Sequence, residues 1–290
     1  MGLLNDKIAV VTGGGGGSGR AAALALASAG ATVVVNDPGV APLPGGDRPA
    51  AAVVAEIVAA GGKAVANFED ASDWAGGERL IEQAFALDGH LDVLVCTADA
   101  VRDRTLHRMS IDEWDAVVHV QLRGHFIPTR LAAARWREQS MRDGPVDARV
   151  IYTASDAGLF GHACQANYAA ATAGITGLCF TAAQELELVG VTVNTVSPRG
   201  GTSPASARSA ATDPAGVGPM VVLLARDEAT DITGQVFRVH GGTVTRLAGW
   251  TERGTVNADH GWEPDELLDA VGEILPGLRA PAPAFRVAIG

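Results

Sequence analysis

The sequence predicts an α/β fold in which helices cover both faces of a parallel sheet. Residues 7–12 form an apolar, β-branched run with the length of a buried strand, and a glycine-rich turn follows at residues 13–19. An alanine-rich segment with a helical pattern then runs from Arg20 to Ala29. Strand and helix patterns keep alternating to about residue 240, which favours one large α/β unit.

The glycine-rich turn has the features of a cradle for a pyrophosphate. Glycines let the backbone approach the phosphates closely, and the start of the next helix offers free N–H groups and the positive end of its dipole. We therefore expect a dinucleotide to contact this turn, through Gly13, Gly16, Gly17, Ser18 and Gly19. The alternative is a glycine-rich loop that binds nothing.

A carboxylate stands where such a cradle needs one. The second strand pattern ends at Asp37, close to the expected ~20 residues after the glycines, where the acidic side chain accepts hydrogen bonds from the adenosine ribose. The same charge repels a 2′-phosphate, so Asp37 favours NAD over NADP. The alternative interpretation of Asp37 is a surface aspartate.

Seven segments have the pattern of buried strands. They lie near residues 7–12, 31–36, 63–67, 91–96, 147–154, 191–196 and 235–239. Because helical patterns separate them, we predict a Rossmann-type, doubly wound sheet of seven parallel strands. We assign residues 1–242 to this dinucleotide-binding and catalytic domain and residues 243–290 to a C-terminal extension, in which a helix begins at Pro264.

Composition narrows the class of function. The net charge of −11 and the pI of about 5.0 argue against binding to nucleic acid or to an anionic membrane surface. No apolar run is long enough to span a bilayer, and no basic, apolar leader precedes the first strand. The three cysteines lack metal-ligand spacing, so we expect a protein of the reducing cytoplasm.

Several sequence strings resemble the short-chain dehydrogenase/reductase family over roughly residues 5–242. The resemblance rests on Thr12-Gly13, on Ser155, and on Tyr168 thirteen residues further on. Within the family, the strings Val33-Val34-Val35-Asn36-Asp37, Arg102-Asp103-Arg104 and Gln165-Ala166-Asn167-Tyr168 look most like the hydroxyacyl-CoA dehydrogenase region of multifunctional enzyme type 2 and like bacterial 3-oxoacyl reductases.

The resemblance implies roles for particular residues. Tyr168 would exchange a proton with the substrate oxygen, Ser155 would hydrogen-bond that oxygen, and Gln121 would stand for the asparagine that relays protons. The family's lysine, which lowers the tyrosine pKa and binds the nicotinamide ribose, is replaced by Thr172. The only lysines, Lys7 and Lys63, fall at the starts of strand patterns, away from the expected cofactor edge.

The resemblance also implies further cofactor contacts. Asp70 with Ala71 would bind the adenine, although Glu69 competes for that role and a helix cap is an equal alternative for either carboxylate. Cys96-Thr97-Ala98 replaces the family's Asn-Asn-Ala beside the cofactor, and Pro198 precedes the substrate lid at residues 200–206. Asp99 brings a second negative charge toward the cleft or points to solvent; both interpretations stay open.

Three functions from different classes follow. The first is an NAD-dependent oxidoreductase acting on a hydroxyacyl thioester, such as an acyl-CoA, or a steroid-like secondary alcohol or ketone, with weakened catalysis. The second is a non-catalytic NAD-binding subunit that pairs with an active relative. The third is a repurposed lyase or isomerase. In each case the family suggests a homodimer or homotetramer.

Other reactive side chains carry less weight. His119, His125 and His162 match no metal-ligand spacing, so we predict no metal site. Cys164 lies just before the tyrosine segment, but no base is paired with it in the sequence, and a packed cysteine is the simpler interpretation.

Overall fold

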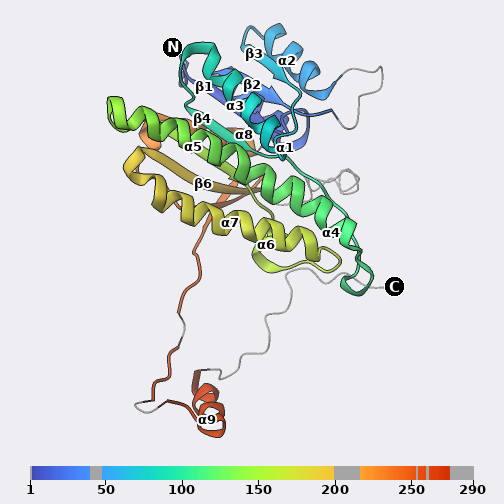
Figure 1. The fold of residues 1–290 in the computed structure, drawn as a ribbon, viewed down its shortest axis with the longest axis vertical. Coiled ribbons are helices and arrows are strands. Elements are labelled where there is room, and N and C mark those ends of the chain that lie inside the picture. The colour runs from blue at the N-terminus through green and yellow to red at the C-terminus, as the bar shows by residue number, and fades with distance from the viewer. Residues whose placement is uncertain (1, 40–47, 199–215, 253, 259–260, 275–290) are drawn as a thin grey trace. The chain divides into compact units, whose positions relative to one another are not determined.

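An eight-stranded sheet runs through the chain in the order β3-β2-β1-β4-β5-β6-β7-β8. The computed structural model describes residues 2–39, 48–198, 216–252, 254–258 and 261–274 (Figure 1). The strands are β1 (Ile8–Thr12), β2 (Thr32–Asn36), β3 (Lys63–Asn67), β4 (Val93–Cys96), β5 (Ala148–Thr153), β6 (Val191–Pro198), β7 (Val236–His240) and β8 (Thr243–Leu247). The first seven are parallel, which confirms the predicted doubly wound sheet.

The predicted number of seven strands is wrong, because β8 adds an antiparallel edge strand beside β7. Gly241 and Gly242 join the two strands, and Gly241 has a φ of +53°. Glycine tolerates the left-handed backbone of tight hairpin turns, so a glycine pair between two strand patterns is a hairpin signal. The sequence contained this signal, but residues after 242 were assigned to the extension.

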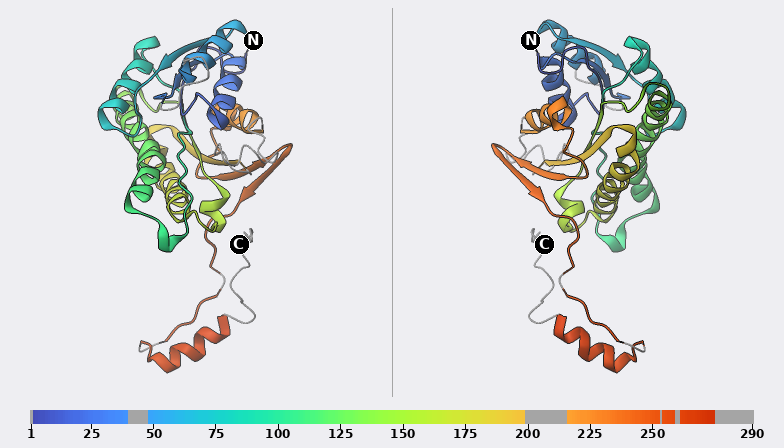
Figure 2. Two further views of the ribbon diagram at one scale, coloured as in Figure 1. Left: turned by 90° about the vertical axis from the view of Figure 1, so that its right-hand side faces the viewer. Right: turned by 90° about the vertical axis from the view of Figure 1, so that its left-hand side faces the viewer.

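Helices cover both faces of the sheet (Figures 1 and 2). One layer holds α1 (Gly17–Ser28), α2 (Pro49–Ala59) and α8 (Val217–Ala225), and the other holds α3 (Trp74–Asp88), α5 (Gly124–Asp143) and α7 (Ala166–Leu186). Alternate residues of β1 pack into different layers, Val11 against α1 and Val10 against α3. Burial on both faces explains why the strands are continuous apolar runs.

Shorter helices lie between these elements. They are η1 (Leu106–Arg108), α4 (Ile111–Val118), the π-helical turn η2 (His119–Arg123), α6 (Asp156–Phe160), η3 (Glu187–Val189) and η6 (Asp227–Ala229). Helix α4 begins with a capping box, in which Ser110 and Glu113 satisfy each other's backbone N–H groups. The π-helical turn then joins α4 to α5, so both helices follow one another almost without a break.

The chain divides into two compact units, Met1–Leu247 and Ala248–Gly290. The second unit contains helix α9 (Pro264–Ile274), which confirms the helix predicted to begin at Pro264. Asp265 and Glu266 lie in its first turn, where negative charges stabilise a helix. No helix among the described residues combines the length and apolar character needed to cross a bilayer.

A buried polar cluster lies between β4, β5 and α5. Tyr152 donates a hydrogen bond to Thr129 Oγ1 at 3.0 Å, and Thr129 Oγ1 donates to the carbonyl oxygen of His125 at 2.8 Å. His125 Nδ1 donates to the Gln121 carbonyl oxygen at 2.6 Å, which leaves Nε2 as the unprotonated ring nitrogen. Because the ring is fully buried, the His125 pKa falls to about 4.

This histidine makes stability depend on pH. The unfolded chain binds a proton at His125 below about pH 6.5 while the folded chain does not until about pH 4, so the free energy of unfolding falls as pH drops through this window. We expect a loss of about 2 kcal/mol between pH 7.5 and pH 5 that His125→Gln does not show. Urea denaturation at both pH values measures it, with exposed His107→Gln as the control. An equal loss in wild type and His125→Gln would contradict the assignment.

Candidate dinucleotide and catalytic cleft

The predicted site residues meet at the carboxyl edge of the sheet. Gly13 follows β1, Asp37 follows β2, and Ser155 lies two residues beyond the end of β5. Parallel strands place all of their carboxyl ends at one edge, and the order reverses between β1 and β4. Ligands of doubly wound sheets bind in the crevice at such a reversal. The fold therefore gathers into one region residues that are far apart in sequence.

Close backbone packing explains three of the glycines in the turn. A Cβ on Gly13 would lie 2.7 Å from Ala98 Cα, and one on Gly19 would lie 2.2 Å from the Gly13 carbonyl oxygen. A Cβ on Gly15 would lie 2.5 Å from Asp37 Oδ2. At Gly13 and Gly19 the close atoms belong to the backbone, so a larger residue would require a shift of the loop, whereas at Gly15 the Asp37 side chain would have to move. Asp37 is thereby placed against the glycine turn.

Two further glycines face open space. A Cβ on Gly16 or on Gly17 would have no heavy atom of the described residues within 4 Å. Gly16 precedes α1 without a side-chain cap, so the first N–H groups of that helix are available to a ligand. The buried hydroxyl of Ser18 also has no hydrogen-bond partner among the described residues. These features fit a bound pyrophosphate, which would accept hydrogen bonds from these groups.

The two predicted carboxylates on the adenosine side are held differently. Asp37 Oδ1 accepts from the backbone N–H of Gly39 at 2.8 Å. Asp70 Oδ1 accepts from both the backbone N–H and the hydroxyl of Ser72. Asp70 therefore closes the turn that contains Ala71, whereas Asp73 caps α3 by accepting from Gly76 N. The competing carboxylate of Glu69 pairs with Arg79 at 2.6 Å, and this ion pair lowers the Glu69 pKa.

The end of β4 is fastened to the end of β1. Thr97 Oγ1 donates to the Thr12 carbonyl oxygen at 2.6 Å, and Thr97 N donates to Thr12 Oγ1 at 3.2 Å. The Cys96 side chain is fully buried, and burial raises its thiol pKa to about 12, so it stays a neutral thiol. Only Thr97 and Ala98 of this segment approach the glycine turn. The threonine is thus a structural link between the two halves of the cleft.

Asp99 has a partner that the sequence did not reveal. Gln121 Nε2 donates a hydrogen bond to Asp99 Oδ1. Gln121 lies in the π-helical turn, and its side chain is only 3% exposed. Asp99 is exposed, as the solvent interpretation expects, and the buried Gln121 amide holds its carboxylate at the carboxyl edge of the sheet. The two residues are 22 positions apart in the sequence, so no local motif predicts their contact.

The serine and the tyrosine belong to neighbouring helices. Ser155 precedes α6, and its Oγ accepts from the backbone N–H of Ala157 at 3.2 Å. Tyr168 lies in the first turn of α7, which packs against α6, and is 7% exposed. Asn167 fixes this turn, because its Nδ2 donates to the carbonyl oxygens of Arg102 and Glu113 and its Oδ1 accepts from Tyr168 N. Asn167 therefore holds the first turn of α7 in place, a role that the sequence did not predict.

Thr172 is enclosed in the helix rather than directed at a ligand. It is 1% exposed, and its hydroxyl donates to the Tyr168 carbonyl oxygen at 2.7 Å. A Cβ on Gly158 of α6 would lie 2.5 Å from Thr172 Oγ1, so the two helices approach closely at this point. The threonine therefore packs α7 against α6 and brings no charge to Tyr168.

The remaining predictions fall partly outside the described residues. Pro198 is the last residue of β6 and is buried at the carboxyl edge of the sheet, and the predicted lid at residues 200–206 lies outside the described residues. Lys7 lies at the opposite edge, with its Nζ 2.9 Å from Asp227 Oδ1 and 3.5 Å from Asp147 Oδ2. These ion pairs engage Lys7 in the fold, so it cannot stand in for the missing lysine.

His125, His162 and Cys164 make contacts within the fold. His162 Nδ1 lies 2.9 Å from the Ala163 carbonyl oxygen, and His125 belongs to the buried cluster. Cys164 has a φ of +68°, and its carbonyl oxygen accepts from Arg104 N at 2.8 Å. Across the described residues, no group of three or more His, Cys, Asp or Glu side chains is arranged to hold a metal ion.

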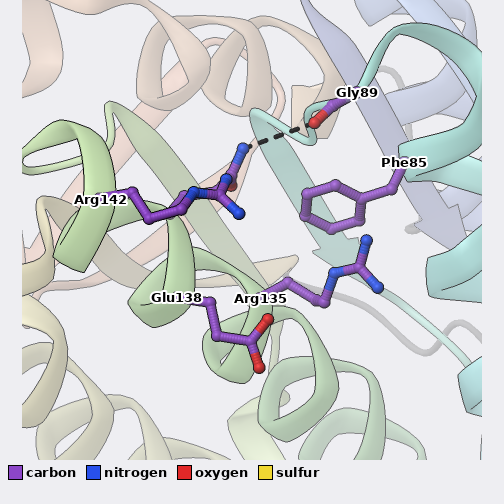
Figure 3. A pocket seen from close by; sticks show the side chains of 6 residues that line it. Phe85, Gly89, Arg135, Glu138 and Arg142 are labelled. Carbon is purple, nitrogen blue, oxygen red and sulfur yellow. Dashed lines mark hydrogen bonds between the residues drawn. The ribbon is translucent and has the colours of Figure 1, made fainter.

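A small pocket lies away from this cleft, between the end of α3 and α5 (Figure 3). Its lining includes Phe85, Arg135 and Arg142, and the guanidinium of Arg135 lies 4.8 Å from the centre of the Phe85 ring. The carbonyl oxygen of Gly89 faces it from the end of α3. None of the predicted site residues lines this pocket, so it is separate from the dinucleotide cleft.

Comparison with known proteins agrees with this geometry. Residues 7–214 match the short chain dehydrogenase family. The chain is 43% identical over 300 residues to hydroxyacyl-CoA dehydrogenase ChsB1 of Mycobacterium tuberculosis, across 97% of this chain and 92% of that protein. It is 38% identical over 248 residues to peroxisomal multifunctional enzyme type 2 of Mus musculus, across 83% of this chain but 32% of that much longer protein.

A solved structure gives the same result. The crystal structure of a short chain dehydrogenase from Mycobacterium avium is 43% identical and has a TM-score of 0.89, with 99% of this chain and all of that chain covered. The protein therefore has the fold and cleft of a dinucleotide-binding α/β protein. It belongs to the short-chain dehydrogenase/reductase family, as the sequence strings indicated.

Two glycine variants test the geometry of the turn. Gly19→Ala forces a methyl group against the Gly13 carbonyl oxygen, so we expect it to lower the free energy of unfolding by about 2–4 kcal/mol. Gly16→Ala places its methyl group in open space at an extended φ of −160°, so we expect no change beyond about 0.5 kcal/mol. Urea denaturation measures both, and equal effects would contradict the close packing at Gly19.

Proposed function

We propose that this chain is an NAD-dependent dehydrogenase or reductase acting on a hydroxyacyl thioester or on a steroid-like secondary alcohol or ketone, with weak catalysis. The observation that carries the proposal is the placement of Ser155 before α6 and of Tyr168 in α7, which packs against α6, at the sheet edge that also holds a glycine turn that fits a pyrophosphate. The similarity to a hydroxyacyl-CoA dehydrogenase over nearly the whole of both chains supports the substrate class.

The choice of NAD over NADP rests on the charges near Asp37. A carboxylate beside the turn accepts from both ribose hydroxyls and repels a 2′-phosphate. Among the described residues, Arg20 is engaged away from Asp37, since its Nη2 lies 2.6 Å from Glu56 Oε2. Arg48 lies closer, because its Nη2 donates to the Pro38 carbonyl oxygen at 2.9 Å and its guanidinium lies 3.7 Å from the centre of the Phe68 ring. The preference for NAD therefore rests on the Asp37 carboxylate.

The protein residues supply positioning and proton transfer. Bound NAD would accept or donate the hydride. The Ser155 hydroxyl donates a hydrogen bond to the substrate oxygen, and the Tyr168 phenol gives a proton to that oxygen in reduction or removes it in oxidation. Asn167 and the Arg104–Gln165 bridge between loop and helix hold the tyrosine turn in place. The hydroxyl of Ser155 already accepts from Ala157 N, which fixes its direction.

The residue at position 172 limits the rate. A free phenol has a pKa near ~10, and the buried, neutral Thr172 adds no positive charge that would lower it. Loss of such assistance in acid–base catalysis costs about 10²- to 10⁴-fold in rate.

The same observation favours a second candidate, a non-catalytic NAD-binding subunit that partners an active relative. A repurposed lyase or isomerase is the third candidate, and product formation without a change in nicotinamide absorbance would favour it. We further propose a homodimer or homotetramer in the cytoplasm.

The cofactor preference is tested at Asp37. We expect wild type to bind NADH with micromolar affinity and NADPH at least tenfold more weakly, because only NADPH brings a phosphate to the carboxylate. Asp37→Ser removes the repulsion and the ribose contact, so NADH binding should weaken by about tenfold while NADPH binding does not. Isothermal titration calorimetry measures both. Exposed Asp88→Ser is the control, and tighter NADPH binding by wild type would overturn the preference.

The variant Thr172→Lys tests the proposal that this chain is an oxidoreductase with weakened catalysis. Restoring a cation one helical turn from Tyr168 should raise hydride transfer by about 10²-fold or more, because the phenol pKa falls. The assay follows nicotinamide absorbance with 3-hydroxyacyl-CoA and hydroxysteroid substrates. Thr181→Lys, at an exposed position of the same helix, should change nothing, and adding Tyr168→Phe to Thr172→Lys should abolish the gain.

The packing of Thr172 against Gly158 makes a folding check necessary. Thermal unfolding should show that Thr172→Lys remains folded and still binds NADH. A folded, NADH-binding variant with no gain on any substrate would contradict the oxidoreductase proposal and favour the non-catalytic subunit.

A further inference from the structure

The hydrogen bond from Gln121 fixes the Asp99 carboxylate at the boundary between the two halves of the cleft. Asp99 follows Ala98, and Ala98 Cα is the atom closest to the position of a Cβ on Gly13. Ala98 Cβ also lies 3.8 Å from the corresponding position at Gly124, where η2 ends and α5 begins. The carboxylate thus stands between the glycine turn and the π-helical turn, at the carboxyl end of β4.

The support beneath this carboxylate is rigid. Gln121 is buried and lies in a π-helical turn, a rare feature that is frequent at functional sites. The carbonyl oxygen of Gln121 accepts from His125 Nδ1, so both ends of the residue are fixed by hydrogen bonds. An exposed aspartate held from below by a buried amide is preorganised, and binding to it costs little side-chain entropy.

The position of Asp99 determines which part of a bound dinucleotide its carboxylate would contact. The pyrophosphate lies over the glycine turn after β1, and the adenosine half extends toward β2 and β3. Moving from β1 to β4 therefore leads to the second ribose. A carboxylate only accepts hydrogen bonds and repels phosphate, whereas ribose hydroxyls donate. An ionised carboxylate offers about four lone-pair sites on its two oxygens, so it can accept from a ribose hydroxyl while Gln121 holds it.

We propose that Asp99, held by Gln121, binds the hydroxyls of the second ribose of the dinucleotide, on the nicotinamide side of the pyrophosphate. The inference rests on the proposed NAD-binding function and deepens it. Thr172 does not offer this contact, because it is buried and its hydroxyl donates to the Tyr168 carbonyl oxygen. The cleft then holds both ends of the dinucleotide through carboxylates, Asp37 on the adenosine ribose and Asp99 on the other.

Truncated ligands separate this role from a general effect on the cleft. NADH and ADP-ribose contain the second ribose, whereas ADP does not. Asp99→Ala should weaken NADH and ADP-ribose binding by about 10- to 100-fold, the usual range for a hydrogen bond to a charged group, and should leave ADP binding unchanged. Gln121→Met should weaken the first two ligands by a smaller factor, since it releases the carboxylate without removing it. Calorimetric titration of the full chain gives all three affinities.

The control and the contrary outcomes are distinct. Asp115→Ala removes one exposed carboxylate from α4 and should leave all three affinities unchanged. Equal weakening of ADP and NADH by Asp99→Ala would show that Asp99 maintains the cleft, and unchanged NADH affinity would show that it binds no ribose; either result overturns the inference. If wild type binds neither NADH nor ADP, the proposed NAD-binding function fails first, and that failure is seen without any variant.

Discussion

The cleft depends on the close approach of the loops that follow β1 and β4. Gly13 and Gly19 allow the turn to lie against Thr97 and Ala98, and Thr97 hydrogen-bonds both the carbonyl and the hydroxyl oxygen of Thr12. This contact brings the N-terminus of α1 beside the end of β4, where the strand order reverses. Without it, the pyrophosphate cradle and the region of Asp99 would not share one crevice.

The second half of the site depends on how α7 is held. Asn167 links the first turn of α7 to the backbone at Arg102 and Glu113, and Gly158 lets α6 pack against Thr172. These contacts keep Ser155 and Tyr168 on neighbouring helices. Position 172 holds a buried, neutral threonine, so it brings no charge to the tyrosine. Positioning and pKa adjustment are separate contributions to catalysis, and the proposed function relies on the first.

Local patterns predicted most of the fold. Buried parallel strands are continuous apolar runs, so the sequence predicted β1 to β7. Pro264 followed by two acidic residues predicted the start of α9. The eighth strand was missed because no residue of β8 is fully buried, so it lacks a continuous apolar run, although the Gly241-Gly242 turn indicated a hairpin. The positions of Gly13 and Asp37 at strand ends followed from their distance to the strand patterns, which is a local property.

Local sequence patterns could not predict contacts between segments that are far apart in the chain. Gln121 and Asp99 meet only because the π-helical turn returns to the end of β4, and Asn167 reaches a loop and helix α4, both more than 50 residues upstream. The enclosure of Thr172 depends on Gly158 in another helix. Spacing along the chain carries no information about any of these three contacts, whereas the fold determines all of them.

The central claim is that this cleft still transfers a hydride without the lysine. The most direct measurement is to incubate the protein with NADH deuterated at C4 of the nicotinamide and a 3-oxoacyl-CoA, and to analyse the product by mass spectrometry. The account predicts slow formation of a 3-hydroxyacyl-CoA that carries one deuterium at C3, and its loss in Tyr168→Phe. A protein that binds NADH but forms no deuterated product, even over many hours, would contradict it.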